Sequence, residues 1–280
     1  MKALVAQTSC LWGRQASCLA KRKNQARRPI ARQARCFCHF LGTCRAFAVV
    51  FFSLCALVHN AIKIPLVKPK ERAHARAAWL HRWSRFACRV LGIRATTRGS
   101  MPSSGLLVSN HLSYLDIIVL SSIRPCVFVA KRGCREVAAI RLAGACCRDD
   151  LCRSRAETFE SEGREWCSGR DRRRLGLVLF PEGTSSDGST VLPFKSALLE
   201  SAVQLRSSIA VASIEYALDY GSVADEVCYW RDMTLVPHLL NLLFKPEIRA
   251  NYSFLSVKIR AGNRKEIACE LRDEIVSIRS

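Results

Sequence analysis

Two short stretches of sequence decide the fold prediction. Residues 105–116 read GLLVSNHLSYLD, and residues 175–186 read LGLVLFPEGTSS. In each stretch an uncharged apolar run is followed by polar residues and turn formers, which is typical of a buried strand that ends in a loop. Loops at the carboxyl ends of strands are where open α/β sheets bind ligands. We therefore expect the functional residues in these two loops.

The surrounding sequence predicts strands that alternate with helices. Beside the two strands above, we expect strands at 93–98, 125–130, 209–216 and 252–260, and helices at 113–122, 196–205 and 264–278. This alternation favours an α/β domain in which helices cover a mixed sheet. Residues 145–174 are crowded with Arg and Cys and show neither period, although structureless loops of that length are uncommon in compact domains.

The amino-terminal third is organised differently, and we divide the chain into four segments. These are a basic, disordered arm at 1–36, a hydrophobic membrane segment at 37–67, a basic amphipathic helix at 68–92 and a globular domain at 93–280. The uncharged run Ala46–Val58 has thirteen residues, fewer than the about 20 that span a bilayer. A marginal transmembrane or half-inserted helix is favoured over a buried core helix, and the helix at 68–92 suits either a membrane surface or its own domain.

Charge and cysteine usage limit the partners. The formal net charge is +21, and thirteen Lys and Arg precede the first acidic residue, Glu71. Such a basic end favours a phospholipid surface, a nucleic acid or a solvated disordered arm. Because no nucleic-acid module is recognisable, we expect no nucleic-acid partner. The fifteen cysteines contain no C-x-x-C pair, so we expect reduced thiols and no metal site.

His111 and Asp116 are the candidate catalytic residues. A histidine near a strand end can act as a general base when a carboxylate fixes its tautomer and stabilises the imidazolium. In the second loop, Pro and Gly force a turn that presents Glu182 and Thr184 at the sheet edge. Each motif alone is weak, because an H-x-x-x-x-D pair arises by accident in roughly one such chain in five. The second loop alone is equally typical of an ordinary strand-to-helix turn.

Together, and in this order, the two motifs resemble the glycerolipid acyltransferase family, whose best-known members acylate lysophosphatidic acid. Residues 110–116 match the family's N-H-x-x-x-x-D, and residues 180–184 match its F-P-E-G-T. Between them, residues 127–131 begin the family's Lys or Arg motif. The resemblance covers residues 90–260 and implies the family's fold and a membrane location, with the catalytic domain on the cytoplasmic face.

The resemblance also implies the reaction. An acyl thioester, either acyl-CoA or acyl-carrier protein, would donate a fatty acyl group to the hydroxyl of a lysolipid, and no bound cofactor is expected. His111 would take the proton from that hydroxyl, with Asp116 orienting the ring. The residues implied for acceptor binding are Lys131, Glu182, Gly183 and Thr184.

Several departures from the family pattern bear on activity and substrate. The second motif lacks its usual Pro and the strand after it, so a reading-frame error or an inactive, membrane-bound scaffold is an alternative hypothesis. Ser185 stands where members that bind a phosphate monoester often have Arg, whose fork grips phosphate bidentately. The runs 180–188 and 229–234 resemble lyso-ornithine lipid acyltransferases, although Arg231 replaces the Gly usual in that branch. Lysophosphatidic acid and lyso-ornithine lipid are both candidate acceptors.

Overall fold

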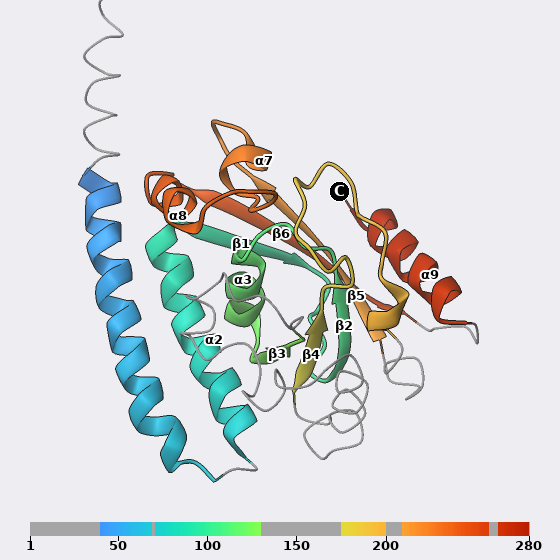
Figure 1. Cartoon of the computed structure of the whole chain (residues 1–280), viewed down its shortest axis with the longest axis horizontal. Coiled ribbons are helices and arrows are strands. Elements are labelled where there is room, and N and C mark those ends of the chain that lie inside the picture. The colour runs from blue at the N-terminus through green and yellow to red at the C-terminus, as the bar shows by residue number, and fades with distance from the viewer. Residues whose placement is uncertain (1–39, 69–70, 130–174, 200–208, 258–262, 280) are drawn as a thin grey trace, which may run out of the picture.

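The computed structural model describes residues 40–68, 71–129, 175–199, 209–257 and 263–279 (Figure 1). The predicted arm at 1–36, Lys131 and the aperiodic stretch 145–174 lie outside these residues. The strands are β1 Ile93–Arg98, β2 Gly105–Ser109, β3 Cys126–Phe128, β4 Gly176–Leu179, β5 Ile209–Ala217 and β6 Ile248–Val257. Helical elements after the N-terminal helix are α2 Arg72–Leu91, α3 Leu115–Ile123, η3 Ser196–Leu198, α7 Val223–Glu226, α8 Leu235–Leu243 and α9 Arg264–Ser277.

The six strands form one mixed sheet in the order β1-β6-β5-β2-β4-β3. β5 and β6 are antiparallel, whereas the other neighbouring pairs are parallel. β2 lies inside the sheet, flanked by β5 and β4, and its residues 106–109 are buried. Because β2 and β4 are parallel, the loops after them open at the same edge of the sheet. The mixed α/β sheet that the sequence predicts is confirmed.

Helices cover both faces of this sheet, as Figure 1 shows, with α2 and α3 on one side and α9 on the other. Leu107 packs into the core beneath α2 and α3, while its neighbours Leu106 and Val108 pack into the core beneath α9. Successive side chains of a strand point to opposite faces, so an uninterrupted apolar run is what a doubly covered strand requires.

The N-terminal helix Phe40–Leu66, blue in Figure 1, is long and apolar enough to cross a membrane by length and composition. It lies along α2, where the ring of Phe52 stacks on that of Phe86 at 5.6 Å and Trp83 Nε1 donates to His59 Nδ1 at 3.3 Å. Its other side carries a row of exposed apolar residues: Phe40, Phe47, Val50, Phe51, Leu54, Val58, Ile62 and Leu66. An exposed apolar stripe of this length favours contact with a membrane.

Three elements differ from the sequence prediction. β6 begins at Ile248 rather than at residue 252, because the chain there pairs with β1 on one side and β5 on the other. The helix predicted at 196–205 is described only as η3, since residues 200–208 lie outside the described part of the chain. α7 is absent from the sequence prediction, because its four residues VADE are too few to show a helical period. The amphipathic segment at 68–92 contains α2, which packs on α3 within its own domain and also on the N-terminal helix.

Candidate active site

His111 and Asp116 lie together where β2 gives way to α3. His111 Nδ1 donates to Oδ2 of Asp116 over 2.8 Å. Because a carboxylate can only accept, this bond places the ring proton on Nδ1 and leaves the lone pair of Nε2 free to act as a base. The His111 side chain is 19% exposed and that of Asp116 is 0% exposed. A substrate can therefore reach the imidazole but not the carboxylate.

The carboxylate of Asp116 is buried, and its oxygens are surrounded by hydrogen-bond donors. Its Oδ2 also accepts the backbone N–H groups of Leu112 at 2.7 Å and Ser113 at 3.0 Å. Its Oδ1 accepts the hydroxyl of Tyr216 at 2.7 Å. Asp116 also occupies the first turn of α3, where the helix dipole favours a negative charge. These contacts offset the cost of burying a carboxylate.

The side chain of Asn110 ends the β2 ladder and starts the turn toward His111. Its Nδ2 donates to the carbonyl of Ile214 at 3.0 Å, and its Oδ1 accepts the N–H of Ile214 at 2.8 Å. The side-chain amide of Asn110 thus pairs with β5 in place of a backbone group of β2. The main chain is then free to leave the sheet after β2. This arrangement explains physically why an asparagine immediately before the histidine suits the motif.

The FPEGT loop, residues 180–184, packs against His111. The ring of Phe180 stacks on the His111 imidazole, with centroids 4.2 Å apart and planes 17° apart. Further along, the N–H of Ser186 donates to the carbonyl of His111 at 3.0 Å. Two motifs that are about seventy residues apart in the sequence therefore form one unit around the imidazole.

Glu182 supports the loop that carries His111 from inside the protein. Its residue exposure is 2%, and its Oε1 accepts the backbone N–H of His111 at 3.3 Å. Burial raises the pKa of this carboxyl to about 8, an effect that the His111 N–H partly opposes. The geometry gives Glu182 a structural contact with the His111 backbone. Its part in holding an acceptor headgroup stays a prediction.

The rest of the loop is turned outward. Gly183 has φ 69°, a left-handed conformation that favours glycine, and a Cβ there would lie 2.7 Å from Lys195 Nζ. Thr184 and Lys195 are exposed. An exposed ammonium, a hydroxyl and a glycine backbone meet at this corner, which suits an anionic or polar headgroup. Sequence reasoning proposed Gly183 and Thr184 for this purpose; Lys195, the third member, lies beyond the motif.

Ser185 connects this corner to the segment before α8. Its hydroxyl donates to the carbonyl of Tyr229, and the N–H of Tyr229 donates to the carbonyl of Leu112 at 2.9 Å. The neighbouring Arg231 has φ 52°, the one positive φ of a non-glycine residue in the described part of the chain. A left-handed conformation at this position accounts for the glycine that we expect there in the lyso-ornithine branch.

Comparison with known proteins identifies the family. A family model described as "Acyltransferase" matches residues 92–217. The lyso-ornithine lipid O-acyltransferase of Rhizobium meliloti is 31% identical over 215 residues, covering 68% of this chain and 71% of that protein. The chain belongs to the glycerolipid acyltransferase family. The expected family membership and enzyme class are thereby confirmed.

Other members of the acyltransferase family extend the comparison. The lyso-ornithine lipid O-acyltransferase of Rhodobacter capsulatus is 30% identical over 198 residues, which cover 66% of this chain and 69% of that one. A 1-acyl-sn-glycerol-3-phosphate acyltransferase of Neisseria gonorrhoeae is 26% identical, covering 48% and 56%. The crystal structure of the LPA acyltransferase PlsC from Thermotoga maritima has the same fold, with a TM-score of 0.54 at 16% identity over 87% of this chain and 97% of that one.

The sequence did not point to Tyr216, whose hydroxyl contacts Asp116 of the candidate catalytic pair. It lies 100 residues beyond Asp116, at the end of the apolar strand β5. The signal available in the sequence is a tyrosine, with its polar hydroxyl, in an otherwise apolar strand. A buried tyrosine hydroxyl needs a hydrogen-bond partner. Nothing in the sequence says which partner that is. Among the described residues, no group of three or more metal-ligating side chains is placed to hold a metal ion.

Proposed function

We propose that this acyltransferase moves a fatty acyl group from an acyl thioester to the hydroxyl of a lysolipid. The observation that carries the proposal is the 2.8 Å bond from His111 Nδ1 to the buried Asp116, which leaves Nε2 basic on a partly exposed ring. The relatives named above as lysolipid acyltransferases support the acceptor class.

The chemistry needs only these groups. His111 Nε2 takes the hydroxyl proton as the acceptor oxygen attacks the thioester carbonyl, and Asp116 stabilises the imidazolium that forms. Collapse of the tetrahedral intermediate breaks the carbon–sulfur bond, and the imidazolium returns the proton to the departing thiolate. The products are an ester and a free thiol, so no acyl-enzyme is required. Acyl-CoA and acyl-carrier protein both fit as donors, since each is acidic and this chain carries +21.

Between the candidate acceptors, we favour lyso-ornithine lipid. Ser185 holds the place where Arg would grip a phosphate, and its hydroxyl is already engaged by the Tyr229 carbonyl. An ornithine headgroup carries no phosphate and does not require that guanidinium fork. The exposed ammonium of Lys195 beside Gly183 offers a single positive charge, enough for one carboxylate. Relatives in Rhizobium and Rhodobacter that bear the lyso-ornithine name support the same choice.

The N-terminal helix is proposed to hold the enzyme at the membrane. Its exposed apolar row would contact lipid, while the side that packs on α2 keeps the catalytic domain close to the bilayer. Lysolipid acceptors reside in that bilayer, and both thioester donors are found in the cytoplasm. We therefore propose that the catalytic domain lies on the cytoplasmic face.

The test is acyl transfer by membranes that carry the wild-type chain, His111→Ala or the control His81→Gln. Labelled acyl-CoA and acyl-carrier protein are offered as donors, with lyso-ornithine lipid and lysophosphatidic acid as acceptors. We expect product from the wild type and the control, and a loss of at least about 10³-fold in His111→Ala. His81 is a suitable control because its ring contacts the Ser121 carbonyl, away from the pair.

Two results would count against the proposal. Equal product from His111→Ala would remove the imidazole from the mechanism. No product from folded, membrane-bound wild type with any donor and acceptor would favour the inactive scaffold instead. Turnover of lysophosphatidic acid alone would correct the acceptor but keep the reaction class.

A further inference from the structure

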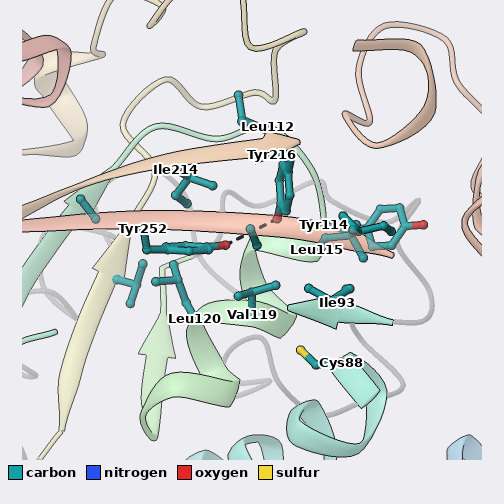
Figure 2. Packing of buried hydrophobic residues seen from close by; sticks show 14 of the residues in the cluster. Cys88, Ile93, Leu112, Tyr114, Leu115, Val119, Leu120, Ile214, Tyr216 and Tyr252 are labelled. Atoms are coloured by element: carbon teal, nitrogen blue, oxygen red, sulfur yellow. Dashed lines mark hydrogen bonds between the residues drawn. The ribbon is translucent and has the colours of Figure 1, made fainter. Parts of the chain in front are cut away.

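Two tyrosines buried in the core beside the catalytic pair are not used by the proposed chemistry. Tyr216 is the penultimate residue of β5 and Tyr252 lies within β6, with residue exposures of 8% and 1% (Figure 2). The hydroxyl of Tyr216 donates to Asp116 Oδ1 at 2.7 Å, and the hydroxyl of Tyr252 lies 3.5 Å from that of Tyr216. Two phenol groups at such depth are costly unless their hydroxyls are satisfied.

The antiparallel pairing of β5 with β6 brings the two rings together. Tyr216 is opposite Ala250, and Tyr252 is opposite Ile214, so the tyrosines are diagonal neighbours on one face of the sheet. The small side chain of Ala250 leaves room beside Tyr216. Figure 2 shows the two hydroxyls pointing toward each other, joined by a dashed line. The strand register therefore determines where the Tyr216 hydroxyl lies.

The two oxygens of Asp116 are held by different parts of the protein. Oδ2 accepts three donors from within five residues: His111 Nδ1 and the N–H groups of Leu112 and Ser113. Oδ1 accepts the Tyr216 hydroxyl, which comes from the sheet. Rotation about the terminal bond of an aspartate is soft and broad. Fixing both oxygens holds the carboxylate in the one orientation in which Oδ2 faces His111.

The Tyr216 hydroxyl is suited to remain a donor. Burial raises its pKa well above the ordinary value, and the nearby charge of Asp116 raises it further. The phenol consequently keeps its proton throughout the pH range in which an imidazole base operates. Hydrogen bonds to a charged acceptor are roughly twice as strong as neutral ones. This bond therefore also favours a charged Asp116 when the imidazolium forms beside it.

We propose that Tyr216 is a positioning residue for acyl transfer, which holds Asp116 Oδ1 so that Oδ2 stays on His111 Nδ1. Tyr252 lies beside Tyr216 on the next strand, with 3.5 Å between the two hydroxyls, and is not part of this positioning. The kinetic part of this inference rests on the proposed function, whereas the effect on the His111 ring does not. Tyr216 touches no substrate in this account and acts through Asp116 alone.

The test compares the full-length chain in detergent micelles with Tyr216→Phe and the matched control Tyr252→Phe, each of which loses one hydroxyl. For Tyr216→Phe we expect kcat to fall about 10- to 100-fold, since a charge-assisted bond is lost. KM for both substrates should stay within about twofold, because ground-state binding is unchanged. Tyr252→Phe should keep kcat within about threefold, as the bond to Asp116 remains.

A spectroscopic measurement separates this inference from the proposed function. In protein labelled with ¹⁵N-histidine, the low-field resonance of the His111 Nδ1–H, assigned by its absence in His111→Ala, reports the bond to Asp116. We expect it to persist in Tyr252→Phe and to shift upfield or broaden in Tyr216→Phe. That outcome supports the inference even if the wild type transfers no acyl group. An unchanged resonance in folded Tyr216→Phe, or an unchanged kcat in an active enzyme, would overturn it.

Discussion

Glu182→Gln is expected to stabilise the protein at alkaline pH and to have little effect at acidic pH. Burial raises the pKa of this carboxyl to about 8 from its ordinary value of 4.5. Glutamine has nearly the same shape and keeps an oxygen that can accept the His111 N–H, but it cannot ionise. The substitution thus imitates the protonated form of Glu182 that the folded protein prefers.

The magnitude follows from linkage. The folded state binds the Glu182 proton more tightly than the unfolded state, so between pH 4.5 and about 8 it holds more protons. The free energy of unfolding contributed by this group therefore falls as pH rises through that window, and is largest below it. Each pH unit is worth about 1.36 kcal/mol, which gives an upper limit of about 5 kcal/mol. A chain of this size should show about 2–4 °C in Tm for each kcal/mol.

The assay is thermal unfolding in detergent at pH 5 and pH 8 for the wild type, Glu182→Gln and the exposed control Glu71→Gln. We expect the Tm of Glu182→Gln to exceed that of the wild type by several degrees more at pH 8 than at pH 5. The control should give the same difference from wild type at both values. A gap that stays constant or narrows as pH rises would show that Glu182 is not held protonated by burial, and would refute the reasoning.

Two further substitutions test how the catalytic loop is held. Asn110→Ala leaves the N–H and carbonyl of Ile214 without their partners. The free energy of unfolding, measured by denaturant titration, should therefore fall by about 2–5 kcal/mol. A loss below about 0.5 kcal/mol would contradict the role of Asn110 in ending the ladder. Arg231→Gly relieves a left-handed φ of 52°, and should raise stability by about 1 kcal/mol in the same titration, whereas a loss would mean that the cation above the Trp230 ring outweighs the strain.

Local sequence was enough to predict that the two central residues of the candidate site lie together. His111 and Asp116 are five positions apart, and a strand followed by a helix turn is sufficient to bring them together. The sheet class was likewise predictable, because the continuous apolar runs of β2, β4 and β5 are typical of strands that are buried on both faces of a sheet. In such cases the determining contacts lie within a few residues of each other.

Contacts set by strand pairing could not be predicted in the same way. Tyr216 reaches Asp116 only because β5 lies beside β2, and Lys195 reaches Gly183 only because the chain folds back after the FPEGT loop. Glu182 belonged to a recognised motif, yet its sequence gave no sign that the side chain points inward to the His111 backbone. Motif membership indicates that a residue matters, but burial and partners decide what it does.

The segment 229–234, which resembles lyso-ornithine lipid acyltransferases, is joined to the loop that carries His111 rather than separate from it. Tyr229 donates to the Leu112 carbonyl, and its ring packs edge-on against that of Tyr114 at 5.3 Å. The Tyr114 hydroxyl in turn donates to Nδ1 of His238, whose Nε2–H donates to the Cys228 carbonyl. Burial lowers the pKa of His238, which keeps this imidazole neutral and able to perform both roles.

Ser185 stands at the position that carries Arg in phosphate-binding members. Its hydroxyl donates to the Tyr229 carbonyl, and the Tyr229 N–H donates to the Leu112 carbonyl, so this position is linked to Leu112 through one residue. An arginine introduced at 185 would therefore do more than add a charge. It would remove a bond that holds Tyr229, and with it the support of the loop that carries His111. Under the proposed function, changing the acceptor toward a phosphate monoester would then require compensating changes around Tyr229, since the proposed headgroup corner and the loop that carries His111 share the same backbone contacts.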